Sequence, residues 1–113
     1  MNPVIQTLNG AATWDYRIRS FDGWTLVLGG GTTIDYPDNW TVQIEFTGVK
    51  FIQCPTDFSY PRFREPSSSE TDYLSATVAL EPGDLLVAID AECEGSLGDQ
   101  TFFIVAESAN VRE

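Results

Sequence analysis

Apolar and polar residues alternate with a period of two along most of the chain, which is typical of β-strands with one buried face. The clearest alternation covers residues 40–47, and residues 14–19, 24–28 and 85–93 repeat it. At 113 residues the chain has the length of one domain. We therefore expect residues 1–113 to form a single all-β domain, an antiparallel β-sandwich or sandwich-like barrel of about seven strands.

Turn-forming residues separate the predicted strands. Asp22-Gly23 predicts a tight hairpin turn, because both central positions of such a turn need a positive φ. Gly29–Gly31 predict a plain loop or bulge, since no helical pattern follows them. Gly48 predicts a bulge or tight turn that either ends a strand or bends it. The segment Glu-Pro-Gly-Asp at residues 81–84 predicts a type II turn.

Residues 55–70 break the alternation. Pro55, Pro61 and Pro66 are expected to exclude a central strand, while the aromatic residues among them argue against simple disorder. The segment is therefore predicted to be a Pro- and aromatic-rich loop inserted into the domain, and such long loops are often functional. Ser67 and Glu70 match a capping box, which predicts one helical turn.

The last third of the chain is predicted to be a meander of three strands. Residues 74–80 alternate and are assigned to the first strand, and residues 85–93 to the second, with Cys93 on its apolar side. Residues 102–107 are apolar on both faces before Glu107, which predicts a central strand covered on both sides. No helix longer than a turn or two is expected.

Charge and composition exclude several classes of function. Asp and Glu number 17 against 6 Lys and Arg, a net charge of −11, which disfavours nucleic acids and anionic membranes as partners. Histidine is absent, so a Ser-His-Asp triad and histidine metal ligands are excluded. A secretory signal and an apolar span of about 20 residues are also lacking, so we expect a cytoplasmic protein. Cys54 and Cys93 have no metal-ligand spacing and are predicted to be buried free thiols. No cofactor or metal is predicted.

The first candidate site is an acidic ladder. Asp90, Glu92 and Glu94 project from one face of the predicted strand 85–93, and Asp99 in the next loop is placed to join them. Neighbouring carboxylates on one face lie about 6.7 Å apart and repel by about 0.6 kcal/mol in water. Three interpretations stay open: a solvated face paired with the arginines of residues 14–19, a docking surface for a basic partner, and a divalent cation site.

The second candidate site is an aromatic and basic cluster in the 55–70 segment. It consists of Tyr60, Arg62, Phe63 and Arg64. Arginine planes stack on rings and bind carboxylates in pairs, and Tyr and Arg are enriched at binding hot spots. The alternative is a loop held to the sheet by its rings, with each arginine paired to a nearby acid such as Asp57 or Glu65.

The tryptophans bear on ligand binding. Trp24 and Trp40 fall on core-facing positions and are predicted to be buried, whereas Trp14 opens its strand and is a candidate for exposure. An exposed ring beside polar residues is the arrangement of a sugar-binding platform.

These features lead to three functional hypotheses. The first is a non-catalytic binding protein that docks a basic protein. The acidic ladder would supply the electrostatic field that attracts the partner, and the aromatic and basic cluster would supply the anchoring contacts. The second is a small-ligand or carbohydrate-binding module, with or without Ca²⁺. The third is a small hydrolase with a carboxylate pair, which requires one acid with a raised pKa. Exposed strand edges also make a homodimer a reasonable expectation. No motif ties the chain to a named family.

Overall fold

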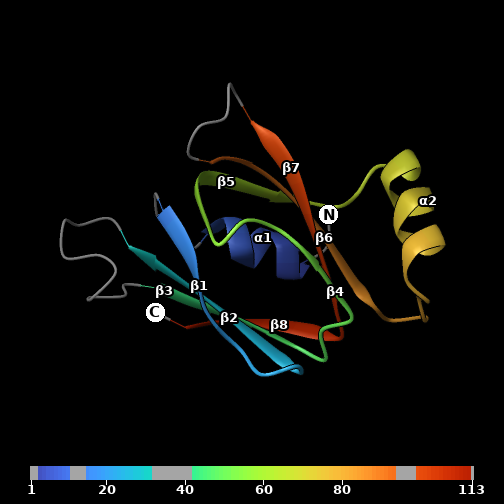
Figure 1. Cartoon of the computed structure of the whole chain (residues 1–113), viewed down its shortest axis with the longest axis horizontal. Helices are drawn as coiled ribbons and strands as arrows, with labels where there is room; N and C mark the ends of the chain where they lie inside the picture. Colours follow the sequence, from blue (N-terminus) through green and yellow to red (C-terminus); the bar gives the residue numbers. More distant parts are fainter. Residues whose placement is uncertain (1–2, 11–14, 32–41, 94–98, 113) are drawn as a thin grey trace.

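The computed structural model describes residues 3–10, 15–31, 42–93 and 99–112. This part of the chain forms one sheet of eight antiparallel strands with two short helices, which confirms the all-β prediction (Figure 1). None of its helices is long and apolar enough to cross a membrane. In chain order the elements are α1 (Pro3–Gly10), β1 (Asp15–Phe21), β2 (Thr25–Gly31), β3 (Val42–Thr47), β4 (Phe51–Gln53), β5 (Asp57–Arg64), α2 (Ser68–Thr77), β6 (Leu85–Glu92), β7 (Gln100–Ala106) and β8 (Ser108–Arg112).

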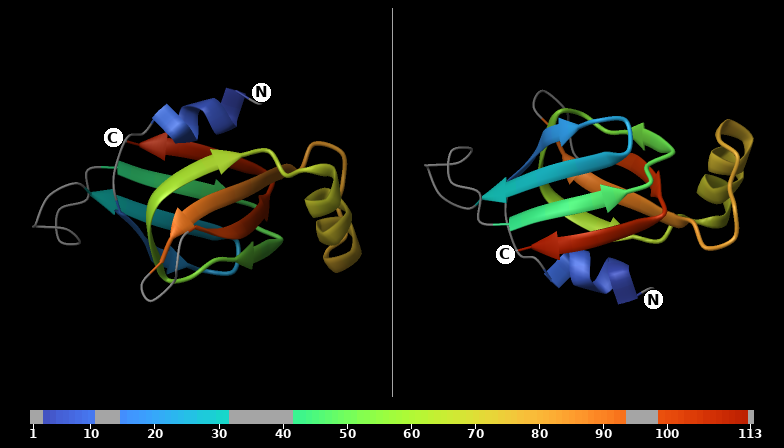
Figure 2. Two further views of the ribbon diagram at one scale, coloured as in Figure 1. Left: turned by 90° about the horizontal axis from the view of Figure 1, so that it is seen from above. Right: turned by 90° about the horizontal axis from the view of Figure 1, so that it is seen from below.

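The sheet has the strand order β4-β7-β6-β5-β1-β2-β3-β8 and curls around a common interior (Figure 2). Its two ends meet at one corner, because residues 48–50 connect β3 directly to β4 and Glu107 alone connects β7 to β8. At this corner the Glu107 amide donates to the Thr47 carbonyl, and the Lys50 amide donates to the Val105 carbonyl. Backbone pairing therefore continues through the bend.

The core fills the interior of the curled sheet. Alternate residues of most strands point inward, as the amphipathic pattern predicted, and β5 adds Phe58 and Phe63 from either side of its bulge; together they form one buried cluster. Helix α1 closes the side of this core between β5 and β8 with Ile5 and Leu8, both almost fully buried. The Asn9 side chain accepts from the Phe63 amide (2.8 Å) and donates to the Phe63 carbonyl (2.7 Å). Asn9 thereby supplies hydrogen-bond partners to the Phe63 backbone on the side of β5 where no neighbouring strand pairs with it.

Helix α2 covers the outer face of β6 and β7. Its buried Leu74 packs with Ala88, Phe103 and Val105 in a second apolar cluster. The Ser67–Glu70 capping box is confirmed, but the helix continues to Thr77, so the predicted strand at residues 74–80 is wrong. Leu74 and Val78 lie four residues apart, a spacing that fits a helix as well as a strand, so the apolar pattern alone does not distinguish the two. The prediction that β7 is central and covered on both sides is confirmed.

The predicted loop at residues 55–70 is also wrong, because residues 57–64 form the central strand β5 between β1 and β6. Pro61 is tolerated there by a β-bulge. Ser59 is opposite Glu92 and Arg62 is opposite Asp90, so Tyr60 and Pro61 together face a single residue of β6. The missing N–H of Pro61 therefore falls where the ladder is already interrupted.

Three smaller predictions concern glycines and turns. Gly29–Gly31 belong to β2 and pair with β1, so the predicted loop there is wrong. The hairpin at Asp22-Gly23 is confirmed, although in the turn only Gly23 has a positive φ, at 93°. The Asp22 carboxylate holds this turn by accepting from the Trp24 and Thr25 amides at 2.9 and 2.7 Å. The predicted turns at Gly48 and Gly83 are confirmed with φ of 69° and 90°.

Trp24 is 54 % exposed at the hairpin end, so the prediction that it is a core residue is wrong. It follows the turn directly, and the alternation of the strand does not yet apply to it. The predictions for Trp14, Trp40 and Glu94 concern positions outside the described residues.

Candidate functional site

The bulge in β5 sets Tyr60 apart from the other aromatic residues of that strand. Tyr60 has a φ of 52° and is the one described non-glycine residue with a positive φ. Its side chain is 62 % exposed, whereas Phe58 and Phe63 on the same strand are each 2 % exposed and pack in the core. A left-handed conformation at a bulky residue costs about 1–3 kcal/mol, and such strain often occurs at functional positions. The bulge thus turns one ring toward solvent at a conformational cost.

A pocket of about 350 Å³ opens beside this bulge, where β1, β5 and the end of β6 meet. Six polar or charged residues line it, namely Asp15, Arg17, Asp57, Ser59, Tyr60 and Glu92. They comprise three carboxylates and one guanidinium, which sum to a charge of −2. The pocket walls are therefore acidic, like the chain as a whole.

The strand register places three of these residues in one row across the sheet. Ser59 of β5 is paired with Asp15 of β1 on one side and with Glu92 of β6 on the other. The Ser59 hydroxyl donates to the Asp15 carboxylate at 2.5 Å. The Glu92 carboxylate makes no hydrogen bond or ion pair within the described part of the chain. Two residues further along β1, a guanidinium nitrogen of Arg17 lies 4.0 Å from a carboxylate oxygen of Asp57.

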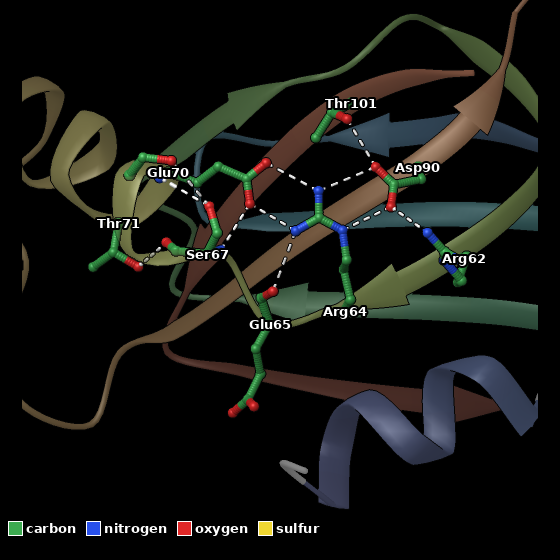
Figure 3. Close-up of polar contacts among 9 residues, drawn as sticks. Arg62, Arg64, Glu65, Ser67, Glu70, Thr71, Asp90 and Thr101 are labelled. Carbon is green, nitrogen blue, oxygen red and sulfur yellow. Dashed lines mark hydrogen bonds and ion pairs between the residues drawn. The ribbon is translucent and has the colours of Figure 1, made fainter. Parts of the chain in front are cut away.

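The two arginines of β5, Arg62 and Arg64, take part in an ion-pair network on the outer face of the sheet (Figure 3). Arg64 lies between Asp90 and Glu70, and its Nε donates to Asp90 at 2.7 Å. Its Nη1 and Nη2 donate to the two Glu70 oxygens at 2.6 and 2.9 Å. Arg62 and Thr101 also donate to Asp90, at 3.1 and 2.7 Å. The network thereby joins α2 to β5, β6 and β7.

The network changes the ionisation of its carboxyl groups. Hydrogen bonds from Arg64 lower the pKa of Glu70 to about 2, and the Ser67 amide adds to this effect. Hydrogen bonds from Arg64, and also from Thr101 and Arg62, hold the pKa of Asp90 well below its usual range. Both carboxylates are therefore engaged within the protein and are not free for a partner.

The structure thus divides the residues predicted to bind a partner into groups. It brings Tyr60 and Glu92 together in the pocket. It commits Arg62, Arg64 and Asp90 to the network, and the predicted pairing of the acidic ladder with the arginines of β1 does not hold for Asp90. These three therefore act in holding the fold.

Phe63 and Asp99 lie apart from the pocket. Phe63 is buried in the core and is no surface anchor, because the bulge shifts it to the inner face of β5. Asp99 is exposed just before β7 and does not line the pocket. Asp15 and Ser59 were missed as site residues, since reading 55–70 as a loop concealed the register that joins them.

The two cysteines are free and half-buried, so the prediction of free thiols is confirmed and that of full burial is not. Burial raises the pKa of the Cys54 thiol to about 11, which keeps it protonated at neutral pH. Cys93 directly follows β6 and contributes to the pocket lining.

Two further observations bear on chemistry at this site. The described residues contain no group of three or more His, Cys, Asp or Glu side chains placed to hold a metal ion. Where a described carboxyl group has a clearly shifted pKa, as in Asp22, Glu70, Asp84 and Asp90, the shift is downward. A carboxyl pair acting as general acid and base needs the opposite shift in one member.

The strain at Tyr60 leads to a test. Replacing Tyr60 with glycine is expected to change the free energy of unfolding by less than about 0.5 kcal/mol, because relief of the strained φ offsets the greater freedom of glycine in the unfolded chain. Replacing it with valine is expected to lower that free energy by about 1–2 kcal/mol, because a β-branched residue fits this conformation poorly. Urea unfolding of both variants checks this, and equal losses would contradict it.

Comparison of the chain with protein-family models, with curated proteins and with solved structures finds no match.

Proposed function

We propose that this chain is a non-catalytic binding protein that docks a basic protein partner, with the pocket between β1, β5 and β6 as its contact region. The observation that carries the proposal is the pocket itself, with three carboxylates against one guanidinium and an outward-turned Tyr60 ring at its rim. A hollow of this charge favours a cationic group, and an exposed tyrosine is typical of a binding hot spot.

The charge of the whole chain supports the same function. A net charge of −11 attracts a basic partner over a distance of about one Debye length, roughly 8 Å at physiological salt. Because Asp90 is neutralised by its arginines, the acids that face the partner are those of the pocket, Asp15, Asp57 and Glu92. In this proposal the pocket carboxylates take the place of the acidic ladder as the surface that contacts the partner.

A small-ligand module is the second candidate. The pocket volume of about 350 Å³ lies at the lower end of the range of ligand sites, roughly 300–1,000 Å³. A small cationic ligand would satisfy the same carboxylates without a protein partner.

A charge-matched pair of double variants tests the proposal. The pocket variant is Asp15→Asn with Glu92→Gln, and the control is Glu65→Gln with Asp72→Asn, two exposed acids outside the pocket. Both remove two negative charges and keep the side-chain shapes. The probe is a fluorescein-labelled decapeptide in which arginine and lysine alternate with glycine, followed by fluorescence anisotropy at about 20 mM and about 150 mM salt.

The pocket variant is expected to weaken peptide binding at least about tenfold, because it loses direct contacts to the bound peptide, and the control less than about twofold. Binding by the unchanged protein is expected to weaken as salt rises. Equal weakening in the two variants would show that only the total charge matters, and the pocket would then not be the contact region.

A further inference from the structure

We propose that the group received by the pocket is a single arginine side chain of the partner, held between Asp15 and Glu92 above Ser59 with its plane against Tyr60. This inference rests on the proposed function and specifies the chemistry of the same pocket. It separates a guanidinium from an ammonium group.

The spacing of the two acids suits a guanidinium. Asp15 and Glu92 lie on β1 and β6, on either side of Ser59 in β5. Neighbouring strands are about 4.8 Å apart, so the two backbones that carry these acids are separated by roughly 10 Å. A guanidinium presents five N–H donors along the edges of a plane and contacts carboxylates on two sides. The three donors of an ammonium group share one nitrogen, which suits a narrower gap.

The same protein already holds one of its own arginines between two carboxylates. Arg64 lies between Glu70 and Asp90, which come from different elements, and donates to both oxygens of each (2.6–3.2 Å). Figure 3 shows the guanidinium plane with one carboxylate on each side. In the pocket, two carboxylates again flank a gap, and Arg17 of the chain is directed toward Asp57. Asp15 and Glu92, which flank Ser59 in the strand register, are the pair that would hold an incoming cation.

The other faces of a bound guanidinium would meet Ser59 and Tyr60. The Ser59 hydroxyl donates to Asp15, so its lone pairs are oriented to accept an N–H from a ligand above it. Tyr60 lines the pocket and is 62 % exposed. A guanidinium stacks on such a ring through cation–π and planar contact, which a hydrated ammonium does less well.

The test compares three probes by NMR titration of the ¹⁵N-labelled protein, namely the amides of N-acetyl-arginine, N-acetyl-lysine and N-acetyl-citrulline. The arginine amide is expected to shift the backbone signals of Ser59, Tyr60 and Glu92, with a Kd at least about fivefold below that of the lysine amide. The citrulline amide has nearly the same shape without the charge and is expected to cause no shift at these residues. In the Tyr60→Gly variant the preference for arginine is expected to shrink to less than about twofold.

The outcomes separate this inference from the proposed function. Equal Kd values for the arginine and lysine amides would overturn the arginine assignment and leave the docking of a basic partner standing. Equal shifts from the citrulline amide would overturn it too, because charge would then play no part. Absence of any shift at the pocket would also overturn it, whereas the proposed function would fall if the pocket variant weakened peptide binding no more than its charge-matched control does.

Discussion

Replacing Phe63 with alanine is expected to lower the free energy of unfolding by about 3–5 kcal/mol. The Phe63 ring is 2 % exposed and contacts Tyr16 edge-to-face, with ring centroids 6.0 Å apart. Its backbone is held by Asn9, so the cavity cannot close by a simple shift of β5. Urea unfolding followed by tryptophan fluorescence measures this change.

A second variant distinguishes a core residue from a binding anchor. Phe63→Leu is expected to lower the free energy of unfolding by about 1–1.5 kcal/mol and to leave binding of the basic decapeptide unchanged. If that variant were as stable as the original protein and lost peptide binding, Phe63 would be a surface anchor, and its burial in the core would be contradicted.

Replacing Arg64 with methionine is expected to lower the free energy of unfolding by about 2–3 kcal/mol at neutral pH. Methionine keeps much of the side-chain length but leaves Glu70 and Asp90, whose side chains are 21 % and 12 % exposed, without their main partner. Arg62→Met is the matched control, because Arg62 is 72 % exposed and its pair with Asp90 is expected to contribute less than about 1 kcal/mol.

The same network predicts how stability depends on pH. Glu70 and Asp90 have lowered pKa values in the folded protein, so they stabilise it fully above their unfolded values near 4. This stabilisation is lost as pH falls through the folded values, about 2 for Glu70. The difference in stability between the Arg64→Met variant and the original protein should therefore shrink between about pH 5 and pH 2. A difference that is constant over this range would show that the methionine variant is unstable for another reason.

The strands that can be predicted from the sequence are those in which apolar and polar residues alternate along the whole strand. In residues 42–47 buried and partly exposed side chains alternate throughout, and in residues 85–92 the inward face is buried along the whole strand, although Ala88 on the other face is buried as well, beneath α2. The Ser67–Glu70 cap likewise acts within a single turn, and its prediction holds. Local patterns of this kind need no knowledge of the rest of the fold.

The errors arise where distant residues decide. Pro61 lies in a central strand because it falls in a bulge opposite β6, where its missing N–H breaks no ladder hydrogen bond. No neighbouring residue in the sequence predicts that bulge. The helix at residues 68–77 exists because Leu74 finds an apolar surface on Phe103 and Val105, which come from β7. Strand β8 alternates polar and apolar residues, but its place beside β3 depends on its short connection to β7.

The candidate site was only half predictable for the same reason. Tyr60 and Glu92 are recognisable as a ring beside basic residues and as part of an acidic row. Asp15 and Ser59 become site residues only through the pairing of β1 with β5, which depends on the register of the whole sheet. Conversely, Arg64 and Asp90 resemble binding residues in the sequence but satisfy one another in the fold.

The most direct test of the account is to map where the basic decapeptide binds, using backbone NMR signals of the ¹⁵N-labelled protein. Binding at the pocket predicts that the largest shifts occur at Asp15, Ser59, Tyr60 and Glu92, and that they disappear in the Asp15→Asn, Glu92→Gln variant. Shifts centred on α2 or on the exposed Phe21 and Trp24 of the β1–β2 hairpin, with the pocket signals unmoved, would contradict the account.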